Sequence, residues 1–507
     1  MNIKQAKQEI TNTLRAYLTR DELGNYLIPS IRQRPVLLMG PPGIGKTQIM
    51  EQIAAETGVG LVSYTITHHT RQSAVGLPFI EKRTYGGREY SVTEYTMSEI
   101  LSSVYQLMER TGLREGILFL DEINCVSETL APMMLQFLQC KTFGNQKLPE
   151  GWLIVAAGNP PEYNKSVRDF DVVTLDRVKR IDVEEDFGVW KEYARRRGLH
   201  GAVVSYLDIK KDNFYRIENT ADGLQFATAR GWEDLSELLY AYETLGIRAD
   251  REVVGQYIQM PRIAKDFANY LEMFYKYQKT YHVEGILSGT WENITVLELR
   301  EAPFDEKLSV MGLVLSRLSE EARNTRCQDA LTDALHTSLT EFREKIADAP
   351  PLTVLDQLLW KRRTAMKQAK EAGQLDKESR DLKQREINAL EDYRQRLDRE
   401  AVAPEGAMDA VRGWFGEEVE RRKAMAMETK DMFDNAFRFL ETTFGDSQEL
   451  VIFVTEITVG YNTSWFVEQF GCDAYFRHNR ELLFDSTRHR IREEIAAAKA
   501  AEQEENT

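Results

Sequence analysis

The amino-acid sequence predicts an α/β fold in which a parallel β-sheet domain comes first and a mostly α-helical region follows. Three short runs before residue 160, at 35–39, 116–120 and 152–157, are apolar along their whole length, as strands are when helices cover both faces of a sheet. Segments with helical spacing of apolar residues separate these runs, and strands that alternate with helices are typical of parallel sheets. Beyond about residue 187 the pattern becomes helical.

The elements of the first part follow one another along the chain. Apolar residues recur at helical spacing from Ile3 to Leu18, which predicts an opening amphipathic helix. A buried strand then ends in a Gly-Pro-Pro-Gly loop, and a helix continues from that loop. The same patterns predict a strand over 35–39, a helix over 47–57, a strand over 61–67, a hairpin turn at Gly86–Gly87, a helix over 98–110, and strands over 116–120 and 152–157.

The helical part has its own landmarks. Segments 190–197 and 232–245 are amphipathic candidates. Residues 350–445 are rich in Lys, Arg, Glu, Asp and Gln, which predicts long exposed helices, with a helical hairpin broken near Gly373. Such a region is either a solvated helical surface or a coiled-coil partner surface. The apolar run 450–454 is expected to be buried.

Composition limits the class of protein. The chain has 507 residues and a formal net charge of −15, whereas nucleic-acid binders usually carry a basic surplus, so nucleic acid is an unlikely partner. The four cysteines are scattered and predict reduced thiols. The adjacent pair His68 and His69 would point to opposite faces of a strand, which makes a poor metal chelate. The polar start and the absence of a membrane-span-length apolar stretch predict a cytoplasmic protein.

The strongest functional signal is a glycine-rich loop between a strand and a helix. It fits the pattern G-x-x-x-x-G-K-[ST], in which backbone N–H groups close around phosphate oxygens. The lysine is expected to contact the β- and γ-phosphates of ATP, and the threonine hydroxyl is expected to contact Mg²⁺. The residues of this predicted ATP site are Gly40, Pro41, Pro42, Gly43, Ile44, Gly45, Lys46 and Thr47.

Two further strand ends carry candidate catalytic groups. Asp121 and Glu122 end the apolar strand at 116–120; we expect Asp121 to hold Mg²⁺ together with Thr47, and Glu122 to polarise the attacking water. Taken alone, this pair could be two surface acids at the end of a strand. Asn159 follows the strand at 152–157, where its amide could hold the water or a γ-phosphate oxygen. Asn-Pro taken alone is usually only a turn.

These three segments together resemble the AAA+ superfamily of P-loop ATPases, and more closely its MoxR-like branch. The resemblance covers roughly residues 30–250 and rests on GPPGIGKT, THHTRQSAVGLPF, ILFLDEIN, KLPEGWLIVAAGNP and LDR. It implies an AAA+ α/β domain over 1–186 and a helical lid over 187–280. The resemblance does not extend beyond about residue 280, where the residue pattern alone predicts a mostly helical C-terminal region over 281–507. It also implies two small insertions, for which segments 76–90 and 141–149 are the candidates.

The resemblance further implies two arginines that sense nucleotide. Arg177, in the LDR segment, would act on the ATP of a neighbouring subunit; Arg168 and Arg180 are the alternatives. Without that role, Arg177 would be a surface arginine paired with Asp176 or Asp182. Arg230 would be the lid arginine, although many relatives have proline before it, where this chain has alanine.

By this resemblance, the expected function is that of an ATPase that assembles as a homo-oligomeric ring, with a hexamer as the expected form, and remodels or matures a protein. A partner carrying a von Willebrand factor A domain is part of the same implication. The alternative is a nucleic-acid-stimulated motor of the helicase-like or restriction-linked kind, which stimulation of hydrolysis by DNA or RNA would distinguish. A third reading, a non-catalytic module gated by nucleotide, does not need Glu122.

Overall fold

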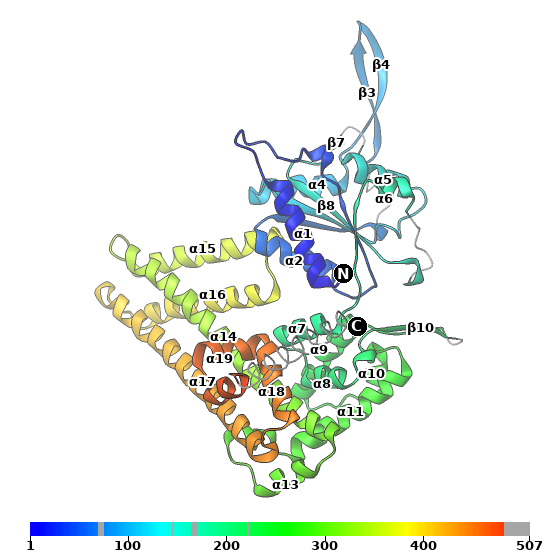
Figure 1. Cartoon of the computed structure of the whole chain (residues 1–507). Coiled ribbons are helices and arrows are strands. Elements are labelled where there is room, and N and C mark those ends of the chain that lie inside the picture. Colours follow the sequence, from blue (N-terminus) through cyan, green and yellow to red (C-terminus); the bar gives the residue numbers. More distant parts are fainter. Residues whose placement is uncertain (69–75, 144–145, 164–169, 221–222, 481–507) are drawn as a thin grey trace, which may run out of the picture. The chain divides into compact units, whose positions relative to one another are not determined.

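The computed structural model describes residues 1–68, 76–143, 146–163, 170–220 and 223–480, and Figure 1 shows the whole chain. The chain divides into two compact units. Unit 1 comprises residues 1–189 and 340–404, and unit 2 comprises residues 190–339 together with the chain from residue 405 onward. The domain boundaries at 186 and 280 stay predictions.

Unit 1 contains a parallel sheet, as the sequence predicts, and this sheet has five strands where four were predicted. Its strands are β1 (Val36–Met39), β2 (Gly60–Thr65), β5 (Gly116–Asp121), β8 (Trp152–Gly158) and β9 (Lys179–Asp182). They lie in the order β2-β5-β8-β1-β9, with every neighbouring pair parallel. The strand β9 was not predicted, because its sequence Lys-Arg-Ile-Asp is mostly charged and only one of its four residues is buried.

One face of this sheet is covered by helices α1 (Ile3–Leu18) and α2 (Lys46–Thr57). Successive side chains of a strand point to opposite faces, so Ile117 and Phe119 of β5 join this core. Ile10 of α1 is fully buried in the same cluster, which explains why the first helix has apolar residues at helical spacing.

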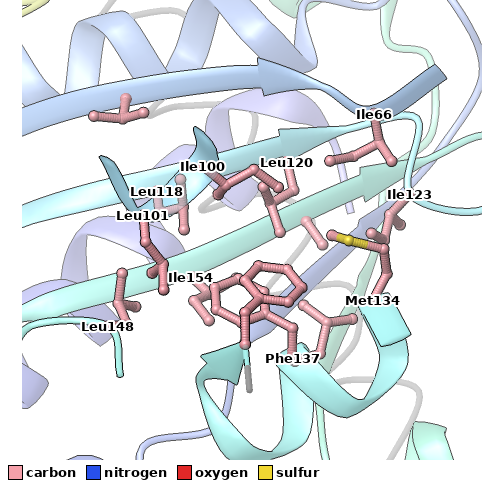
Figure 2. Packing of buried hydrophobic residues seen from close by; sticks show 14 of the residues in the cluster. Ile66, Ile100, Leu101, Leu118, Leu120, Ile123, Met134, Phe137, Leu148 and Ile154 are labelled. Carbon is pink, nitrogen blue, oxygen red and sulfur yellow. The ribbon is translucent and has the colours of Figure 1, made fainter. Parts of the chain in front are cut away.

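The other face is covered by helices α4 (Glu99–Thr111) and α5 (Ala131–Cys140). Leu118 and Leu120, the alternate residues of β5, pack there against Ile100, as Figure 2 shows. Both faces of β5 are therefore buried, which accounts for a strand that is apolar along its whole length.

Unit 1 also contains several short strands and a short helix outside the main sheet. A hairpin of two exposed eight-residue strands, β3 (Pro78–Tyr85) and β4 (Arg88–Tyr95), turns at two glycines with positive φ, as predicted. The other small elements are β6 (Thr142–Phe143), β7 (Gln146–Lys147) and α6 (Val172–Leu175). The strands β6 and β7 form a two-residue antiparallel pair within the segment 141–149.

A helical hairpin from the charged region belongs to unit 1. Its helices α15 (Pro351–Glu371) and α16 (Lys377–Arg399) lie side by side, and the chain turns between them at Gly373, whose φ is +69°. The carbonyl of Ala372 accepts a 3.0 Å hydrogen bond from the N–H of Leu61. The hairpin turn therefore satisfies a backbone donor on the free side of the edge strand β2.

Unit 2 is mostly helical. Its elements are α7 (Phe187–Arg197), α8 (Gly201–Ile209), β10 (Arg216–Thr220), β11 (Gly223–Ala227), α9 (Ala229–Leu245), α10 (Arg251–Tyr257), α11 (Pro261–Thr280), α12 (Val283–Ser288), α13 (Asn293–Glu301), α14 (Phe304–Lys345), α17 (Ala407–Phe444), α18 (Gln448–Val459) and α19 (Tyr461–Phe470). The antiparallel pair β10–β11 was not predicted, since the sequence beyond 187 was expected to be helical.

The apolar run at 450–454, expected to be buried, lies on α18; Leu450, Phe453 and Val454 are buried, whereas Val451 is 42% exposed because it lies on the outer face of the helix. Within the described residues, no single helix has the length and apolarity to cross a membrane; α18 and α19 pass such a test only as a pair bent by 88°.

Candidate functional site

The three predicted motifs lie at the carboxyl ends of neighbouring strands. Strand β8 lies between β5 and β1, and Met39 of β1 pairs with Gly158 of β8 while Leu120 of β5 pairs with Ala156. The loops that follow these strands therefore leave the sheet at one edge. In open α/β sheets this edge is where ligands bind.

The glycine-rich loop has a backbone that its glycines permit. Gly43 and Gly45 have φ values of +75° and +94°, in the left-handed region that side chains other than glycine rarely adopt. Gly45 is also the residue at which α2 begins. A side chain on Gly40 would place its Cβ 2.7 Å from the carbonyl oxygen of Val183, so only glycine fits there. The positive end of α2 faces the loop, which suits an anion.

Lys46 joins the first motif to the third. Its side chain is buried, and Nζ donates hydrogen bonds to the carbonyl oxygens of Gly40 and Pro41 at 2.7 and 2.8 Å. The same ammonium donates to Oδ1 of Asn159 at 2.8 Å. A buried ammonium needs such acceptors to offset its lost hydration. The positive charge is thereby fixed between the glycine loop and the end of β8.

The two groups expected to hold Mg²⁺ are in direct contact. The hydroxyl of Thr47 donates to Oδ2 of Asp121 at 2.9 Å. A carboxylate beside a hydroxyl is an oxygen donor set that a hard cation prefers, and Mg²⁺ is commonly held by one or two such protein groups plus substrate phosphates. The donor set therefore fits the predicted metal.

Glu122 has a strained backbone and a fixed side chain. Its φ is +57°, which is uncommon for any residue but glycine, and such strain is often found at functional sites. Its N–H donates to Oδ1 of Asp121 at 2.9 Å, and its Oε2 accepts a 2.8 Å hydrogen bond from the hydroxyl of Thr67. Sequence analysis missed Thr67; its position at the end of the predicted strand 61–67 was the available signal.

Asn124 is a second residue that sequence analysis missed. Its side chain is buried; Nδ2 donates to the carbonyl of Asn159 at 2.8 Å, and Oδ1 accepts from the Asn159 N–H at 3.3 Å. The two bonds hold the Asn159 backbone in place. A Cβ on Gly158 would lie 2.7 Å from Asn124 Oδ1, so the glycine makes room for this contact.

Comparison with known proteins identifies the domain. Residues 36–175 match the family described as ATPase family associated with various cellular activities (AAA). This chain carries an AAA ATPase domain.

A curated bovine (Bos taurus) protein, ATPase family gene 2 protein homolog B, is 34% identical over 93 residues. The match spans 18% of this chain and 10% of the bovine protein. A solved structure named "putative ATPase", from Cytophaga hutchinsonii, matches 36% of this chain and 50% of its own, with 16% identity and a TM-score of 0.21. The chain thus spans a small part of the bovine relative and half of the solved chain.

Arg177 lies near the amino ends of the strands in the sheet of the AAA ATPase domain, whereas the glycine-rich loop follows the carboxyl end of β1. It precedes β9, which begins opposite Val36, at the amino end of β1. Its side chain is exposed, and its guanidinium donates a hydrogen bond to the Gln139 side chain. The alternative Arg180 is paired with Asp182 at 2.9 Å, and Arg168 lies outside the described residues.

Arg230 is the second residue of α9, in unit 2, and is exposed. The helix begins at Thr228, whose hydroxyl accepts a hydrogen bond from the Gly231 N–H at 3.2 Å. This cap fixes the first turn that presents the arginine. The histidine pair 68–69 lies partly outside the described residues; no cluster of metal-binding side chains occurs elsewhere in the described chain.

Proposed function

We propose that this protein is a MoxR-like AAA+ ATPase that hydrolyses ATP as a ring of six subunits and uses the energy to remodel or mature a partner protein. The observation that carries the proposal is the meeting of three motifs at one sheet edge: Lys46 contacts Asn159, and Thr47 contacts Asp121. These contacts join residues 74 to 113 positions apart in the chain, and each has the chemistry its motif requires.

Each residue has a distinct task in hydrolysis. Lys46 and the N–H groups of the glycine loop would bind the phosphates, and Thr47 and Asp121 would hold Mg²⁺, which when bound neutralises charge on the phosphate oxygens. Glu122 would orient and polarise the attacking water, with Thr67 fixing its carboxylate. Asn159 would act on the water or on the γ-phosphate from the next strand end.

The ring proposal rests on Arg177. The four residues of β9 rise about 13 Å along the sheet, and Arg177 lies before the first of them. Its guanidinium therefore cannot reach the phosphate loop of its own sheet, which begins after the last residue of β1. An exposed arginine at the amino end of β9 can act on ATP only if a neighbouring subunit places its own ATP site beside it.

The test uses substitutions of full-length protein. Glu122→Gln should bind ATP and retain it, because the phosphate and metal groups remain while water activation is lost; Lys46→Ala should lose ATP binding. Light scattering with ATP should show a ring for Glu122→Gln. A monomer at micromolar protein, or hydrolysis by Glu122→Gln at the unsubstituted rate, would contradict the proposal.

Mixing two inactive proteins tests the action of Arg177 across subunits. Arg177→Ala should bind ATP but hydrolyse it about 10³-fold or more slowly. A Lys46→Ala subunit still supplies the arginine, so the mixture should regain turnover, whereas each protein alone stays inactive. If mixed rings form and remain inactive, Arg177 is not the residue that acts in trans, and Arg180 and Arg168 become the candidates.

The remodelled partner is proposed to be a protein, in line with the von Willebrand factor A domain partners of MoxR-like relatives. Affinity purification of the complex under native conditions would identify it. Stimulation of ATP hydrolysis by DNA or RNA, without stimulation by the co-purified protein, would favour the nucleic-acid motor instead.

A further inference from the structure

Unit 2 contains a polar cavity far from the three motifs in the sequence. Its volume is about 680 Å³, within the range of pockets that hold small molecules. The end of α8, the turn after it and the first turns of α11 form its walls. Twelve residues line it: Asp208, Ile209, Lys210, Lys211, Asp212, Asn213, Arg216, Arg262, Ile263, Lys265, Asp266 and Asn269.

The lining has an excess of positive charge in a chain whose net charge is −15. Five of the twelve residues are lysine or arginine and three are aspartate, so the lining carries a formal charge of 5 − 3 = +2. Ile209 and Ile263 are the apolar members, which makes hydrophobic recognition a minor contribution. We call this cavity the basic pocket.

A hydrogen-bonded network fixes the floor of the basic pocket. The hydroxyl of the buried Tyr206 donates to Asp266 at 2.8 Å and accepts from the Asn213 side chain at 2.7 Å. Lys210 pairs with the same aspartate at 2.5 Å. Asp208, on the wall, pairs with Lys191 at 2.5 Å. Two of the three acids are therefore already neutralised by partners within the protein.

The remaining cations point to an anionic ligand. Within the described part of the chain, Lys211, Arg262 and Lys265 form no direct ion pair, although Arg262 also attracts Asp266, which Lys210 already neutralises. Asp212 is the one acid of the lining without a direct ion pair. Arg262 and Lys265 lie three residues apart and so share a face of α11. Arginine meets two phosphate oxygens at once, and lysine adds a point charge beside it.

The start of α11 adds to this field. The helix has twenty residues and begins with Pro261, which has no N–H; the N–H groups of Arg262 and Ile263, next in the first turn, have no carbonyl partners within the helix. Met260, the residue before it, supplies no side-chain acceptor. The positive end of the helix therefore favours an anion in the basic pocket. The carbonyl end of α8 opposes this effect, but Lys210 and Lys211 follow it immediately and offset its negative charge.

We propose that the basic pocket binds a small molecule carrying two or more phosphate groups, at a site separate from the glycine-rich loop. Multiple phosphates match three unpaired cations and a helix start, and the cavity volume suits a molecule of nucleotide size. Binding at the basic pocket does not require hydrolysis of ATP, so this proposal can be tested separately from the function proposed above.

The test is calorimetric titration of the full chain with inorganic pyrophosphate, in the presence of EDTA. Lys46→Ala is used throughout, so that the glycine-rich loop does not contribute. In that protein, pyrophosphate should bind at one site, and the further pair Arg262→Gln with Lys265→Gln should weaken binding at least tenfold. The matched control is Lys276→Gln with Lys279→Gln, which removes the same charge from exposed positions farther along α11 and should change affinity less than twofold.

A second variant guards against misfolding. Asn269 is exposed on α11 at the cavity wall, so Asn269→Glu should leave the fold intact while it repels the anion, and it too should weaken binding at least tenfold. Absence of pyrophosphate binding to Lys46→Ala would overturn the proposal. So would an equal loss of affinity in the control pair, or undiminished binding to Asn269→Glu.

Discussion

The clearest energetic consequence of the site concerns Asn124, whose buried side chain makes two hydrogen bonds to the backbone of Asn159. Asn124→Ala removes both bonds and leaves an N–H and a C=O without their partners. Each bond contributes about 1 kcal/mol net, and a buried group left unsatisfied costs about 1 to 3 kcal/mol. Two such groups together would cost about 2 to 6 kcal/mol. Because Asn159 is only half-buried, we expect the lower part of this combined range, a loss of about 2 to 4 kcal/mol in the free energy of unfolding.

The same substitution should affect hydrolysis more than nucleotide binding. Asn159 accepts a hydrogen bond from Lys46, so a displaced Asn159 disturbs the groups around the γ-phosphate while the glycine loop stays intact. Urea unfolding measures the stability change, and steady-state ATP hydrolysis beside nucleotide affinity measures the functional one. Asn12→Ala, at an exposed position on α1, is the control and should lie within about 0.5 kcal/mol of the unsubstituted protein. The reasoning fails if Asn124→Ala matches the control in stability and hydrolyses ATP at the full rate.

One further prediction follows from a single hydrogen bond, and two follow from the burial of ionisable side chains. Thr67→Val keeps the side-chain shape but removes the hydroxyl that fixes Glu122, so the ATP turnover rate should fall about threefold to tenfold at unchanged ATP affinity. Burial raises the pKa of the Cys472 thiol to about 12, so iodoacetamide at pH 8, followed by mass spectrometry, should label the exposed Cys140 well before Cys472. Burial lowers the pKa of Lys141 to about 8, against about 10.5 unfolded. Between pH 8 and 10.5 the folded protein therefore holds the neutral amine while the unfolded chain stays protonated, so the free energy of unfolding should rise with pH by up to about 3 kcal/mol; urea unfolding of Lys141→Met should lack that rise.

Sequence alone predicted the parts of the fold that local pattern determines. The strand β5 is apolar at every buried position because helices cover both of its faces, and this is visible as a continuous run from 116 to 120. The glycine-rich loop was equally visible, because its glycines, lysine and threonine lie within eight consecutive residues and need no tertiary partner to be recognised.

The rest depends on contacts that no local pattern encodes. The strand β9 is a strand because it pairs with β1 at the sheet edge, where three of its four residues stay at least partly accessible and can be charged. Asn124 lies two residues beyond Glu122 and looks like an ordinary polar residue in the sequence. It becomes important only when β8 brings Asn159, 35 residues later, beside it.

The charged segment 350–445 was predicted only in part from its composition. Its many charged residues predicted exposed helices, but they do not show which apolar residues of these helices are buried. The structure shows that α15 also buries Val354, Leu355 and Leu358, and that the turn after it hydrogen-bonds the free side of strand β2 through the carbonyl of Ala372. An edge strand with unpaired N–H groups invites pairing with other chains, and capping by a distant segment removes that hazard for part of β2. A helical hairpin that follows the last strand of the sheet by more than a hundred residues is therefore a structural component of the same compact unit as the sheet.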